Sequence, residues 1–166
     1  MIRYLFYLVL AVLLVIIQTS IIPYMPPALK FYDFLVPFAV YLSLYKPLGE
    51  GMAVLAVAGL VMDMFSGAPT GVYLITYLWV FLVFRRVGRW VGIKDHLLFS
   101  GLAVLGVLFE NLIFAIAVLA GSSQGFFTLQ SLQIVLLQVF WAVLTAPFLW
   151  LAFKLCFADS GRRYGR

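Results

Sequence analysis

Six apolar stretches, separated by short links, make up most of this chain. They run over Tyr4–Ile22, Phe31–Tyr45, Leu48–Phe65, Gly71–Val87, Leu97–Leu119 and Leu132–Phe157. Most approach the roughly 20 residues that a helix needs to cross a membrane, whereas the second must tilt or lie against partners. Strands of a membrane β-barrel would alternate in polarity over about 10 residues, and no such alternation is visible. The pattern predicts an all-α integral membrane protein, a six-helix transmembrane bundle forming one domain over 1–166.

The composition agrees with a membrane protein. Hydrophobic residues make up 66% of the 166 residues and charged residues 10%, against about 25% charged in soluble domains. The net charge of +5 does not indicate a nucleic-acid partner, because the charges lie between the apolar stretches and act as topology signals. The one cysteine, Cys156, excludes an internal disulfide and offers no metal-ligand set, so we expect no cofactor.

The positive charges predict the orientation of the six spans. One side of the membrane would hold only Lys30, and the other would hold the remaining ten of the eleven Lys and Arg residues. These ten are Arg3, Lys46, Arg85, Arg86, Arg89, Lys94, Lys154, Arg162, Arg163 and Arg166. By the positive-inside rule, both termini should face the cytoplasm. Arg3 before an apolar stretch resembles a signal peptide, but no A-x-A cleavage pattern follows, so we expect an uncleaved first span.

An acidic residue interrupts the apolar sequence where the third stretch turns into the fourth. The pattern G-x-x-x-D-x-x-x-G-x-x-x-G places Gly59, Asp63, Gly67 and Gly71 around this corner. The dipole of the third helix disfavours an acid at its C-terminal end. We therefore expect Asp63 to accept hydrogen bonds from the Ser66–Gly71 turn, or to contact a partner protein. The residues alone leave both roles open.

Two further acids stand at predicted helix starts. Asp33 opens the second stretch, and Glu50 lies in the first turn of the third. Both can satisfy free N–H groups and meet the positive end of a helix dipole. We expect structural roles for both.

Glu110 lies halfway along the fifth stretch, where no Lys, Arg or His is predicted at the same depth. An ionised acid there would cost at least about 2.5 kcal/mol, so we expect a protonated carboxyl that faces the bundle interior or a partner helix. Counting along the helices gives Gln138, Thr145 and Trp79 as its candidate partners. A packing contact is expected rather than a proton relay, since the neighbouring spans offer no further titratable group at that depth.

Small residues form stripes along the third and fifth stretches, which would let helix backbones approach closely. The first stripe comprises Gly49, Ala53, Ala56, Gly59, Asp63 and Gly67, and the second comprises Ala103, Gly106, Glu110, Ala117 and Gly121. Either stripe could pack inside the bundle or dock the transmembrane helix of another protein, and the sequence leaves both possibilities open.

Catalytic patterns are missing from the sequence. His96, the only histidine, is predicted on the opposite side of the membrane from Ser66, so a Ser–His pair is not expected. There is no D-x-x-x-D pair, no H-E-x-x-H motif and no glycine-rich phosphate loop. We therefore expect a protein that is not an enzyme.

Several short motifs follow one another along the first half of the chain. Gln18-Thr19-Ser20 ends the first stretch, Tyr32-Asp33-Phe34-Leu35-Val36-Pro37 opens the second, and Pro47-Leu48-Gly49-Glu50-Gly51 opens the third. The corner from Gly59 to Gly71 comes next. With these motifs the chain resembles the family of the rod shape-determining protein MreD, whose P-D-L-L-L-P is similar to the segment from Tyr32, where proline is common, and whose G-L-L-x-D-L-L-S-G-x-P-L-G is similar to the corner. The motifs lie mainly in residues 18–77, and the second half of the chain matches only in hydropathy.

The resemblance implies a multi-pass subunit of the bacterial inner membrane that belongs to the cell-elongation complex. Members associate with the single-span protein MreC and, through it, with MreB and the peptidoglycan synthases, within membrane lipid. The implied fold is similar to that of the substrate-binding component of energy-coupling-factor transporters. The alternative is therefore a vitamin-binding subunit of such a transporter, which would need a pocket with several convergent polar groups.

Overall fold

The computed structural model describes residues 2–21, 24, 32–66, 71–91, 96–121 and 129–157. Its elements are α1 (Ile2–Ile16), the π-helix η1 (Ile17–Ile21), α2 (Leu35–Tyr45), α3 (Leu48–Phe65), α4 (Val72–Val91), α5 (His96–Gly121) and α6 (Leu129–Phe157). The described residues contain no strand, and each predicted stretch holds one α-helix. The all-α prediction is therefore confirmed, although the second helix begins at Leu35 rather than at Phe31.

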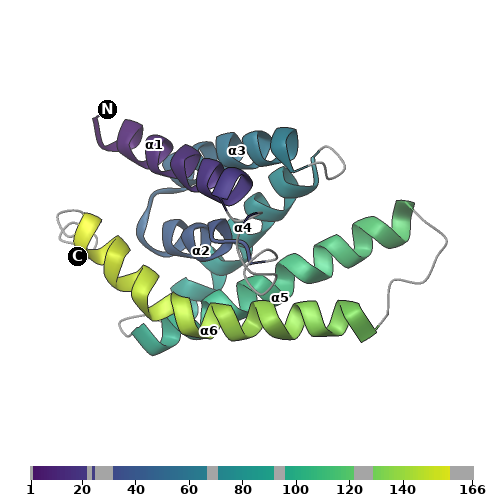
Figure 1. Cartoon of the computed structure of the whole chain (residues 1–166). Helices are drawn as coiled ribbons and strands as arrows, with labels where there is room; N and C mark the ends of the chain where they lie inside the picture. Colours follow the sequence, from purple (N-terminus) through teal and green to yellow (C-terminus); the bar gives the residue numbers. More distant parts are fainter. Residues whose placement is uncertain are drawn as a thin grey trace.

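The helices run up and down, so that alternate ends gather at the same end of the bundle. The start of α1, the α2–α3 link and the ends of α4 and α6 lie together on the left of Figure 1. Side-chain contacts agree, because Nη1 of Arg85 in α4 donates to the carbonyl oxygen of Lys46 at 2.6 Å. Lys46 Nζ in turn lies 4.3 Å from the centre of the Tyr7 ring of α1. The predicted grouping of these segments is confirmed, and the assignment of this end to the cytoplasm stays a prediction.

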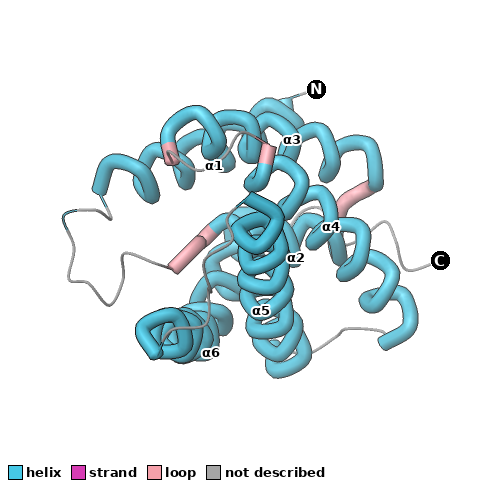
Figure 2. Tube along the Cα trace, turned by 90° about the vertical axis from the view of Figure 1, so that its right-hand side faces the viewer, coloured by secondary structure: helices cyan, strands magenta, loops and turns pink. Residues whose placement is uncertain are grey.

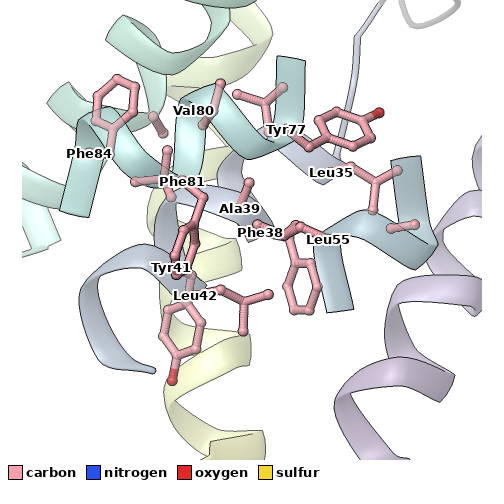
Figure 3. Close-up of a cluster of buried hydrophobic side chains, with 14 of the residues drawn as sticks. Leu35, Phe38, Ala39, Tyr41, Leu42, Leu55, Tyr77, Val80, Phe81 and Phe84 are labelled. Atoms are coloured by element: carbon pink, nitrogen blue, oxygen red, sulfur yellow. The ribbon is translucent and has the colours of Figure 1, made fainter. Parts of the chain in front are cut away.

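The short helix α2 is the centre of the structure. It contacts every other α-helix, with α1 and α3 on one side of it and α5 and α6 on the other (Figure 2). All residues from Leu35 to Ser43 are buried. Figure 3 shows Phe38 and Leu42 packed near Leu55 of α3 and Phe81 of α4. Because neighbours cover α2 on all sides, it carries no polar face, which is typical of a buried helix.

In the part of the chain that the structure describes, three helices are long and apolar enough to cross a membrane by length and composition. The segments concerned are Leu48–Phe65, Leu98–Ile116 and Gln133–Ala152. The apolar segments of α1 and α2 are shorter, and the last turns of α4 are basic. With 11 residues, α2 is only about 16 Å long. A bundle of six helices is thus present, whereas six complete spans remain a prediction.

Glycines on α3 and α5 allow close packing inside the bundle. A Cβ added at Gly59 would lie 2.6 Å from Cα of Leu74, so α3 and α4 nearly touch there. At Gly106, an added Cβ would lie 3.0 Å from a methyl carbon of Val36 and 3.2 Å from one of Val40. Internal packing is therefore confirmed for these two glycines.

Other residues of the two small-residue stripes are not all packed inside the bundle. Gly49 is exposed, with nothing within 4 Å of an added Cβ, and Ala53 and Ala56 are half-buried. Gly67 lies outside the described residues, and so does the side-chain environment of Ala117. The first stripe is thus not one continuous packing face, because Gly49 at the start of α3 lies at the surface.

The alternating direction of the helices predicts which links a reagent outside the cell can reach. In a Cys156→Ser background, a membrane-impermeant thiol reagent should label Ser123→Cys from outside intact cells and should not label His96→Cys. The two positions fall on opposite sides because one complete helix, α5, separates the α4–α5 link from the α5–α6 link. Permeabilised cells, in which both positions should react, serve as the control. Labelling of His96→Cys alone would contradict the orientation.

Candidate functional site

Asp33 is the polar centre of the molecule. It is 5% exposed and lies two residues before α2. Its Oδ1 accepts a hydrogen bond from the backbone N–H of Leu35 at 2.7 Å, and its Oδ2 accepts one from the Tyr77 hydroxyl at 2.5 Å. The first bond satisfies a free N–H at the start of α2, as predicted. The second ties α2 to α4, which the sequence did not reveal.

Two more side chains hydrogen bond with Asp33 from other elements. They are Gln18 of η1 and Glu110 of α5. The amide oxygen of Gln18 is buried without a partner, so its amide nitrogen is the group that donates to the carboxylate. The side chains of buried Asp33, Tyr77 and Glu110, together with half-buried Gln18, form a group that we name the acid cluster. It joins η1, α4 and α5 to the start of α2.

The contact between the carboxyl groups of Asp33 and Glu110 requires that at least one of them carries a proton. Two carboxyl groups can hydrogen bond to each other only if they share at least one proton. Asp33 already accepts hydrogen bonds from Leu35, Tyr77 and Gln18, which stabilises its ionised form. We therefore expect Glu110 to carry the proton and to donate to Asp33. Glu110 is 6% exposed, so its predicted position in the bundle interior is confirmed.

The predicted partners of Glu110 were wrong. Gln138 instead accepts a hydrogen bond from the side-chain nitrogen of Asn111 at 2.6 Å. Thr145 Oγ1 lies 2.8 Å from the Tyr32 hydroxyl oxygen, and Trp79 is 54% exposed.

The shortness of α2 explains this error. Its start reaches the depth of the middle of α5, so Asp33 meets Glu110 there instead of lying at the outer surface. We expected no proton relay because no other titratable group was predicted at the depth of Glu110. Asp33 and Tyr77 are titratable groups at that depth, so this reason no longer holds.

A second polar contact closes the corner between α3 and α4. Asp63 is buried in the last turn of α3. Its Oδ1 accepts a hydrogen bond from the backbone N–H of Tyr73 at 2.9 Å, and its Oδ2 accepts one from Leu74 N–H at 3.3 Å. Both donors lie in the first turn of α4, so Asp63 caps a helix other than its own and meets the positive end of that helix dipole.

The donors that the structure describes lie in α4. The expected donors in the Ser66–Gly71 turn stay a prediction, because residues 67–70 lie outside the described residues. The predicted consequence is confirmed, because the two bonds fix α3 against α4. Gly71 has φ of 95°, a left-handed conformation that glycine adopts without a steric penalty. Its carbonyl oxygen accepts the first hydrogen bond of α4, from Ile75 at 2.9 Å.

The remaining candidates lie away from these contacts. Glu50 is exposed in the first turn of α3, the position that the sequence predicted, and its interaction with the helix dipole stays a prediction. Ser66 follows the end of α3 and His96 begins α5, and these helix ends lie at opposite ends of the bundle (Figure 1). Among the residues that the structure describes, no three His, Cys, Asp or Glu side chains are grouped to hold a metal ion.

Comparisons of the chain with protein-family models, curated proteins and solved structures find no match. The site is therefore interpreted from its own geometry. That geometry consists of two buried carboxylates that hold helix starts and one buried acid that bonds to the first of them.

We predict that Asp63 stabilises the α3–α4 corner. Asp63→Leu should lower the stability by about 2–4 kcal/mol, because two backbone N–H groups lose their acceptor in a buried place. Asp63→Asn keeps one acceptor oxygen and should cost less. Thermal unfolding of the purified protein in detergent measures both effects, with Glu50→Gln as an exposed acid control. An Asp63→Leu variant as stable as the wild type would contradict this role.

We also predict that Glu110 carries a proton at neutral pH. The infrared C=O stretch of a protonated carboxyl should be present in the wild type and lost in Glu110→Gln, because the amide can still donate to Asp33 without holding a carboxyl proton. Glu110→Leu should be less stable than Glu110→Gln by about 1–3 kcal/mol, since Asp33 loses a donor. A band that survives in Glu110→Gln and disappears in Asp33→Asn would place the proton on Asp33 instead.

Proposed function

We propose that this protein is a non-enzymatic membrane scaffold, a MreD-like subunit of the bacterial cell-elongation complex. The proposal rests on one observation, that the two acids of the motifs accept hydrogen bonds at the starts of helices. Asp33 and Asp63 stand in the segments that resemble the family, and each holds the start of a helix, α2 and α4. Gly59 and Gly71 of the same motif give the close approach and the turn at this corner. The motif residues thus build a rigid bundle, which a scaffold requires.

The outer surface supports the same proposal. Large apolar side chains are exposed along α5 and α6, among them Leu108, Leu112, Phe140 and Phe148. Figure 1 shows the end of α5 and the start of α6 projecting past the other elements. Such a surface is suited to lipid and to the single span of a MreC-like partner, through which MreB and the peptidoglycan synthases would be reached. We place the protein in the inner membrane with both termini in the cytoplasm, on the basis of the charge partition.

One observation favours the alternative, a vitamin-binding subunit of an energy-coupling-factor-type transporter. The acid cluster brings several polar side chains together inside the bundle, as a small-molecule site would need. Most of these groups already bond to one another, however, and the Gln18 amide oxygen is the acceptor left without a partner among the described residues. The acid cluster is therefore better suited to fixing the helices against one another than to binding a ligand.

Co-purification tests the scaffold. The detergent-solubilised protein should capture a co-expressed MreC-like single-span protein. Ala117→Leu should fold and reduce capture if the small-residue face of α5 docks the partner. Gly106→Leu serves as the matched internal variant and should lower folded yield, because Gly106 packs against Val36 and Val40.

Two results would contradict the scaffold. One is no capture by the folded wild type. The other is tight, saturable binding of a vitamin to the purified chain alone, which would support the transporter alternative.

A further inference from the structure

The basic end of the bundle, defined by Lys46, Arg85, Arg86 and Arg89, holds two kinds of arginine. Arg85 is half-buried and donates to the Lys46 carbonyl oxygen at 2.6 Å. Its guanidinium also lies 5.7 Å from the centre of the Phe81 ring. Arg85 is therefore engaged in joining α4 to the end of α2.

Arg86 and Arg89 differ, because both are exposed in the last turns of α4. The guanidinium of Arg86 lies 6.0 Å from the centre of the Trp90 ring, an aromatic contact that leaves its N–H donors available. Three of the four acids in the described part of the chain, Asp33, Asp63 and Glu110, are buried. The ends of these two side chains thus present positive charge outward from α4.

An apolar stripe leads along α4 to these arginines. Ile75, Trp79 and Leu82 are exposed, and they follow one another at helical spacing with Arg86 four residues beyond Leu82. Trp90, 79% exposed, continues the same face, where a tryptophan is typical of a membrane interface. One face of α4 therefore changes from apolar to cationic within a single turn.

We propose that this face of α4 binds an anionic phospholipid. Arg86 and Arg89, three residues apart, lie on the same side of the helix and contact the lipid phosphate through charge-assisted hydrogen bonds. The acyl chains lie along Ile75, Trp79 and Leu82. The apolar stripe favours a lipid over a free phosphate, because an inorganic anion would use only the arginines. This site is independent of the scaffold proposal, since it needs no partner protein.

Lipid titration of the purified full chain tests the site. Short-chain phosphatidylglycerol should bind saturably and raise the melting temperature, whereas the matching phosphatidylcholine should do so far less. The double variant Arg86→Gln/Arg89→Gln should bind phosphatidylglycerol about twentyfold more weakly, since each basic residue contributes about fivefold near an anionic surface. Arg86→Lys/Arg89→Lys should recover part of the affinity, because charge is kept and the bidentate geometry is lost.

The matched control is Arg162→Gln/Arg163→Gln, which removes the same charge elsewhere and should keep the wild-type affinity. An equal loss in this control would overturn the proposal in favour of diffuse attraction. Equal binding of phosphatidylcholine would overturn it as well, because headgroup charge would then not matter. Stabilisation by inorganic phosphate alone, equal to that by phosphatidylglycerol, would show an anion site without a lipid.

Discussion

The hydrogen bonds of Asp33 stabilise the start of a short central helix that is buried in the bundle. The start of α2 presents free N–H groups in the bundle interior, where water cannot satisfy them. Asp33 accepts from Leu35 N–H, but this introduces a carboxylate that itself needs donors. Tyr77 and Gln18 donate to it, and we expect a protonated Glu110 to be the third donor. Each donor comes from a different element, so satisfying one helix start also fixes the positions of η1, α4 and α5.

At the α3–α4 corner, a buried carboxylate again accepts hydrogen bonds from the start of a helix. Asp63 lies where the dipole of its own helix disfavours a negative charge, and this cost is offset because the carboxylate caps the neighbouring helix α4. The close approach at Gly59 makes the capping geometry possible, because a side chain there would push Leu74 and the start of α4 away. The glycine and the acid at this corner therefore act as one unit.

The sequence predicted the helices well because each link contains a clear polar or proline interruption, as at Lys46 and Pro47. It also predicted that Glu110 faces the interior and that Asp63 joins α3 to α4. It failed to pair Glu110 with Asp33, because counting residues along helices assumes that every helix begins at the membrane surface. An 11-residue α2 breaks this assumption. Nothing in the local pattern around Tyr77 distinguishes it from the other aromatic residues of α4.

The distribution of polar groups separates an interior that is fixed from a surface that remains available. Inside, the carboxylates of Asp33 and Asp63 are saturated by donors from their own chain, which favours a single rigid arrangement. Outside, α5 and α6 present apolar side chains, and α4 ends in exposed Arg86 and Arg89. A small-molecule site in the core would need several convergent unsatisfied polar groups, whereas the buried side-chain atoms without a partner in the described residues are the Gln18 amide oxygen and the Trp141 indole nitrogen. This distribution favours the proposal that recognition takes place on the apolar surface of α5 and α6 and at the basic end.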